Sequence, residues 1–150
     1  MKTKNFRGLR ILVMITLALL FFQFEMGMAA NLAGPPKLAP LGPSISEFSQ
    51  ALNQAGVVEG IHAGLGSLLP IISLVSLILS LRSGIRSVQI VGSLAFLTIL
   101  LAAITGILFV KSGFQNDGFS HGMATNFFLT LTFNFLVLYF LKPAPKTQSG

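Results

Sequence analysis

Two histidines and one carboxylate lie where long apolar stretches of this sequence open, and these are the residues best suited to chemistry. Glu59 and His62 are three residues apart, so they share one face if the segment is helical. His121 opens the last apolar stretch in a similar way. Ionisable side chains are costly within a bilayer and are functional candidates there. If the two histidines meet at one depth, their neutral imidazoles would ligate the iron of a haem held between helices.

Small residues accompany these side chains and would leave room for a flat ligand. Gly66 follows His62 by about one turn on the same face. Gly106 belongs to a stripe on the third apolar stretch that also contains Gly92, Ala95 and Ala102. Such a stripe permits close approach by another helix or by a planar ligand. We therefore predict Gly66 and Gly106 as cofactor contacts beside His62 and His121.

Other interpretations of the same residues stay open. Either histidine could be an interfacial polar group, and Glu59 could stabilise a helix N-terminus through the helix dipole. The small-residue stripe could serve helix packing alone. Two histidines and a carboxylate could hold zinc or copper. The chain also contains three methionines that could act as axial ligands or fill gaps, namely Met26, Met28 and Met123.

The elements that must position these residues are membrane helices. Hydrophobic residues make up 53% of the 150 residues and charged residues only 9%, far below the charge of a soluble domain. The apolar residues form blocks of about 20, which is the length that crosses a bilayer. We predict one all-α membrane domain over residues 1–150. Its predicted parts are four spans at about 11–30, 57–81, 88–110 and 121–141, an outer loop at 31–56 and a polar tail at 142–150.

The positive charges predict how this bundle is oriented. Most of the ten lysines and arginines fall before the first stretch, between the second and third, or after the fourth: Lys2, Lys4, Arg7, Arg10, Arg82, Arg86, Lys142 and Lys146. Positive charge on alternate loops is typical of cytoplasmic loops, so both termini should be cytoplasmic. Nucleic-acid binding needs basic residues on one exposed face, and we do not expect it. The chain has no cysteine, which excludes disulfides and thiolate-ligated metals.

The first apolar stretch has two interpretations. Its basic lead, apolar centre and small residues at 28–30 are compatible with a cleaved signal peptide. Gln23 and Glu25 favour a retained helix that faces a polar site. After four prolines, Ser44 or Ser46 could cap a short amphipathic helix on which Ile45, Phe48, Leu52 and Val57 recur. That helix would lie on the membrane surface or cover the mouth of the bundle.

This topology makes the second and fourth spans parallel, so His62 and His121 should lie at similar depth toward the outer face. At these residues the chain resembles the haem A synthases. Glu59-Gly60-Ile61-His62 matches the first part of that family's Glu-x-x-His-Arg motif. Thr105–Val110, a short loop and His121 look like its third helix, outer loop and histidine-led fourth helix.

The resemblance implies a four-helix bundle whose paired histidines bind one haem, with Glu59 as the catalytic carboxylate for oxidation of the haem methyl group. It covers about 57–141, one half of a typical member, so activity would require oligomers. Ala63 replaces the arginine of the motif, and the cysteine pair of many members is missing. The pattern is also similar to small uncharacterised four-helix membrane proteins.

We therefore predict a haem-binding protein in the cytoplasmic membrane of a prokaryote, with its site toward the outer face. It would either modify haem, with haem O or haem A as substrate or product, or transfer electrons as a b-type cytochrome. Its partners would be the lipid bilayer and either further copies of itself or subunits of a respiratory complex. The alternative is a haem-free structural subunit or assembly factor of such a complex.

Overall fold

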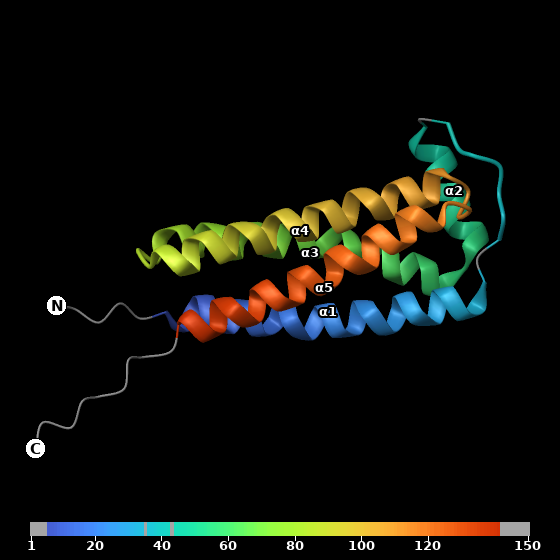
Figure 1. Cartoon of the computed structure of the whole chain (residues 1–150). Helices are drawn as coiled ribbons and strands as arrows, with labels where there is room; N and C mark the ends of the chain where they lie inside the picture. The colour runs from blue at the N-terminus through green and yellow to red at the C-terminus, as the bar shows by residue number, and fades with distance from the viewer. Residues whose placement is uncertain (1–5, 35, 43, 142–150) are drawn as a thin grey trace, which may run out of the picture.

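A computed structural model describes residues 6–34, 36–42 and 44–141, which form five helices (Figure 1). Four are long and apolar enough to cross a membrane: α1 Arg7–Ala33, α3 Val57–Arg82, α4 Arg86–Lys111 and α5 Asp117–Phe140. The fifth is the short α2, Ile45–Ala55. The four predicted spans and the short helix are confirmed as helices, whereas the predicted tail at 142–150 lies outside the described residues.

The long helices form a ring in the order α1, α3, α4, α5. α1 packs against α3 and α5, and α4 packs against the same two helices. Among the described residues, no Cα atoms of α3 and α5 approach within 8 Å of each other, so these two helices lie diagonally across the bundle. Both start at the end where α2 lies, which is the parallel arrangement that the sequence predicts (Figure 1). We call this end the α2 end and the other the packed end.

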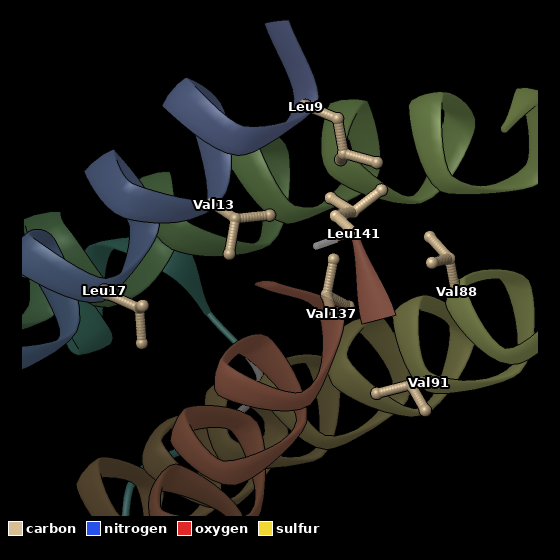
Figure 2. Packing of buried hydrophobic residues seen from close by; sticks show 7 residues of the cluster. All are labelled: Leu9, Val13, Leu17, Val88, Val91, Val137 and Leu141. Carbon is tan, nitrogen blue, oxygen red and sulfur yellow. The ribbon is translucent and has the colours of Figure 1, made fainter. Parts of the chain in front are cut away.

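The packed end is filled by branched aliphatic side chains. One buried cluster joins three helices there and contains Leu9, Val13, Leu17, Val88, Val91, Val137 and Leu141 (Figure 2). α3 and α4 approach closely at the same end, since a Cβ added to Gly92 would lie only 2.6 Å from Cβ and Oγ of Ser80. The Arg10 guanidinium donates a hydrogen bond to the Leu141 carbonyl and ties α1 to the end of α5.

The α2 end is closed by a small separate core. Ser44 caps α2 by accepting a hydrogen bond from the backbone N–H of Ser46 (3.2 Å). Phe48 and Leu52 pack against a buried cluster formed by Ala51, Val110 and Phe114. Ile45 and Val57 do not join this cluster and are 85% and 79% exposed, so only Phe48 and Leu52 of the predicted apolar face pack into the protein.

Backbone hydrogen bonds fix the segment before α2 onto the turn between α4 and α5. The Leu38 N–H donates to the Gly113 carbonyl (3.1 Å), and the Leu41 N–H donates to the Lys111 carbonyl (2.9 Å). Gly113 has φ +68°, and a Cβ there would collide with the Leu38 carbonyl oxygen. The position therefore requires glycine.

Two helix boundaries differ from the predicted ones for local reasons. α5 begins at Asp117 rather than near His121, because the Asn116 side chain caps it by accepting from the Gly118 N–H (3.0 Å). α1 runs from Arg7 to Ala33, beyond the predicted 11–30, and it ends where Gly34 adopts a positive φ.

Candidate functional site

A cavity of about 690 Å³ lies inside the bundle toward the α2 end. Its volume is within the range of pockets for small molecules and cofactors. All five helices contribute to its wall, and α2 does so through Phe48 and Leu52. Its floor is a buried cluster of Leu20, Leu69 and Ile99, which separates the cavity from the packed end.

The cavity exists because small residues gather where the helices face one another. Gly66 of α3 and Gly106 of α4, both predicted as cofactor contacts, line it. Ala102 and Ala103 of α4 line it as well. Side chains this short cannot reach across the bundle, so the space between the diagonal helices stays open.

His62 lies in the cavity wall and is held against α1. Its Nδ1 is 3.2 Å from the Gln23 carbonyl oxygen, which can only accept, so Nδ1 carries the proton. A Cβ at Gly27 would lie 2.9 Å from Cε1 of the ring, so only a glycine at that position lets the ring approach α1. The orientation of His62 thus depends on two residues of the first helix.

The Gln23 side chain completes this contact. Its Nε2 donates to the His62 carbonyl (3.0 Å) and lies 3.4 Å from the imidazole Nε2. The His62 carbonyl can only accept, so the nitrogen of the Gln23 side-chain amide must face it and Oε1 must face away. Oε1 of Gln23 is buried without a hydrogen-bond partner among the described residues. The imidazole Nε2 has no proton in this tautomer, so it is the ring nitrogen that can act as a ligand once the Gln23 amide moves aside.

Glu59 shares this wall, as its spacing from His62 predicts. It is only 8% exposed although it lies in the first turn of α3. The partial positive charge of the helix N-terminus favours a carboxylate there. Glu59 and His62 thus face the same cavity and place a carboxylate beside an imidazole.

The structure does not bring His121 to His62. His121 is exposed and is not among the residues of the cavity wall, whereas its neighbours Ser120 and Ala124 are. The face of α5 that lines the cavity is centred on Ser120, Met123 and Phe127, and each residue turns the helix by about 100°. His121 therefore lies at the border of this face, toward the surface.

The other residues singled out from the sequence also differ in whether they line the cavity. Met28 and Met123 line the cavity, whereas Met26 and Glu25 do not, and Glu25 is exposed. Within residues 6–34, 36–42 and 44–141, no three His, Cys, Asp or Glu side chains gather as a metal site, so the zinc or copper alternative has no ligand set there.

The contact between α1 and α3 was only partly predictable from the sequence. A glutamine inside an apolar stretch indicated a polar site, but nothing indicated His62 as its partner. The role of Gly27 depends on a contact between helices and has no local signal. Comparison with protein-family models, curated proteins and solved structures finds no match to this chain, so the relation to haem A synthases stays a prediction.

Proposed function

We propose that this protein binds haem in the cavity, with His62 as an axial ligand. The observation that carries the proposal is a histidine whose Nδ1 lies 3.2 Å from the Gln23 carbonyl oxygen, in the wall of an apolar cavity of about 690 Å³. The cavity lies between α3 and α5, whose described Cα atoms do not approach within 8 Å of each other, and a planar ligand placed there would contact both.

His62 meets the requirement for a metal-ligating histidine. Such a residue usually donates one ring N–H to a carbonyl or carboxylate, which orients the ring and leaves the other nitrogen for the metal. The Gln23 carbonyl takes that role for Nδ1 of His62. The Gln23 amide lies near Nε2, so it must turn aside when a ligand binds.

The second predicted ligand, His121, does not fit in this conformation. Met123 fits better by position, because it lines the cavity and its Sδ would be 3.1 Å from a Cβ at Gly106. Thioether sulfur is a known axial ligand of haem iron. We therefore propose His62 as the first ligand and compare Met123 and His121 experimentally as the second.

Bound haem would supply one-electron chemistry, and the protein would set its environment. The apolar wall excludes water, and Glu59 would accept or hold a proton beside the ligand. Electron transfer as a b-type cytochrome requires only the axial ligands. Haem modification like that of haem A synthase would also require Glu59 and, by the resemblance, association of at least two copies.

We further propose that the protein lies in the cytoplasmic membrane of a prokaryote with the cavity toward the outer side. The support is the basic residues at the packed end, including Arg10, Arg82 and Arg86, because such residues mark the cytoplasmic side.

The test is a reduced-minus-oxidised visible spectrum of the protein purified in detergent from a haem-replete host. We expect a haem signal that is lost in His62→Ala. Met123→Leu and His121→Ala then identify the second ligand. Loss of an axial ligand changes the spin state of the haem iron, so the variant whose spectrum changes lacks that ligand. Glu59→Gln should keep the spectrum, and product analysis of wild type and this variant separates electron transfer from haem modification.

A protein that stays colourless after haem titration would overturn the proposal. It would support the alternative, a haem-free structural subunit or assembly factor of a respiratory complex.

A further inference from the structure

Helix α2 covers part of the cavity at the α2 end. Phe48 and Leu52 of α2 line the cavity and also pack into the cluster around Phe114. The chain before α2 is fixed to Lys111 and Gly113 by backbone hydrogen bonds. The segments that would have to move for entry from this end are therefore held by both a core and hydrogen bonds.

The seam between α1 and α5 is more open. Figure 1 shows the last turns of α5 beside the start of α1, and its first turns nearer α4. The contacts agree, since Val137 and Leu141 join α1 at the packed end, whereas Gly122 faces Thr105 of α4 at the other end. Met28 of α1 and Ala124 of α5 are both exposed and line the cavity, so the cavity reaches the surface along this seam.

Three aromatic rings bridge the seam where the helices diverge. Phe24 of α1 stacks on Phe127 of α5 with ring centroids 5.5 Å apart, and it lies 6.2 Å from Phe128. All three rings line the cavity, and Phe24 and Phe128 are 38% and 56% exposed. They therefore contact both the cavity and the lipid-facing surface. Rings of this kind change position by rotation about side-chain bonds, without unfolding of a helix.

We propose that the cavity takes its ligand from the bilayer, between α1 and α5, and that Phe24, Phe127 and Phe128 form the gate. This inference rests on the proposed function and specifies its ligand as haem dissolved in the membrane. The rings exclude lipid chains from the empty cavity, and they separate when the flat ligand passes.

A second opening must be distinguished from this one. Gly60 and Gly64 of α3 line the cavity and are exposed, and a Cβ at either would have no atom within 4 Å. A leucine at Gly64 would therefore obstruct that side without a clash.

The experiment measures how fast haem leaves the protein, reconstituted in lipid nanodiscs, for an excess of a soluble haem acceptor. Phe24→Ala and Phe127→Ala should each release haem roughly twofold to tenfold faster, the factor that corresponds to loss of one aromatic pair. Phe22→Ala is the matched control, since Phe22 is an exposed phenylalanine of α1 outside the cavity wall. Its release rate should equal that of the wild type.

Each outcome decides between the routes. Slower release in Gly64→Leu, with unchanged rates in both phenylalanine variants, would overturn the gate and place the route beside Gly64 of α3. Equal acceleration in Phe22→Ala would also overturn it, because the effect would then be unspecific. A wild-type protein that binds no haem at all contradicts the proposed function itself, and that result is visible before any rate is measured.

Discussion

The two ends of the bundle are built from the same four helices but are filled differently. At the packed end, leucines and valines from three helices form one buried cluster (Figure 2). Toward the α2 end, glycines and alanines face one another around a cavity that contains His62 and Glu59. The packed end therefore supplies most of the buried core, whereas the other end contains the cavity in which we propose that haem binds.

One stripe on α4 shows that residue type alone does not decide between these roles. Gly92 and Ala95 lie at the packed end, where they allow α4 to contact its neighbours closely. Ala102 and Gly106 continue the stripe along the same face, yet they line the cavity. A small residue permits helix contact where the opposite helix is near, and it leaves a void where that helix diverges.

Among substitutions that compare the two ends, leucine in place of glycine should give the largest difference in stability. Gly92→Leu should destabilise the bundle by about 3 kcal/mol, because its Cβ alone would lie 2.6 Å from Ser80. Gly64→Leu is the matched substitution near the cavity and should leave stability unchanged. Unfolding by SDS in mixed micelles, followed by circular dichroism, measures both, and equal losses would contradict the comparison.

Replacing alanine by leucine at two positions on one face of α4 tests the same difference in stability between the two ends. Ala95→Leu should lower the free energy of unfolding by about 1–3 kcal/mol, since Ala95 is buried in a filled region. Ala102→Leu should raise it by about 0.5–2 kcal/mol by filling the cavity, and should weaken haem binding. The same SDS titration and a haem titration test both effects. A destabilised Ala102→Leu would show that the cavity is not an open space.

The two histidines should differ in their contribution to stability. His62→Ala removes the hydrogen bond to the Gln23 carbonyl and should lower the free energy of unfolding of the haem-free protein by about 1 kcal/mol. His121→Ala should have no effect, because His121 is exposed. Haem-free protein is required, so that loss of a bound ligand does not enter the measurement. A stability loss in His121→Ala would indicate that His121 points into the bundle.

The smallest effect concerns a polar contact between α4 and α5. Thr130 donates a hydrogen bond to Thr98 (2.9 Å), and both side chains are buried. Thr130→Val should lower stability by about 0.6 kcal/mol, an average value for such bonds in membrane proteins. Thr132→Val is the control, since that hydroxyl donates only within its own helix to the Phe128 carbonyl and is exposed. A double-mutant cycle with Thr98→Val isolates the pair.

Much of the fold was predictable because long apolar stretches have few alternatives to helices in a membrane. The existence of all five helices, the Ser44 cap and the parallel direction of α3 and α5 follow from local sequence and from the number of spans. The start of α5 was predicted one turn late, because a membrane span is recognised by hydropathy, whereas the helix begins at the polar cap Asn116.

The candidate site was predictable only in its local part. Glu59 and His62 share a face because three residues separate them, and this spacing alone brings both into one wall. Whether His121 meets His62 depends on how α5 is rotated about its axis, and in the structure this rotation keeps His121 out of the cavity wall. That rotation is set by packing against α4, which no spacing within α5 reveals.

Local sequence was enough to predict an all-helical protein with four long apolar helices, and to place Glu59 and His62 on one helix face. The tertiary structure alone decided that Gln23 and Gly27 of α1 hold His62, that His121 lies outside the cavity wall, and that one small-residue stripe both packs and lines a void. The physical reason is that periodicity fixes which residues share a helix face, whereas the partner of that face depends on how separate helices cross.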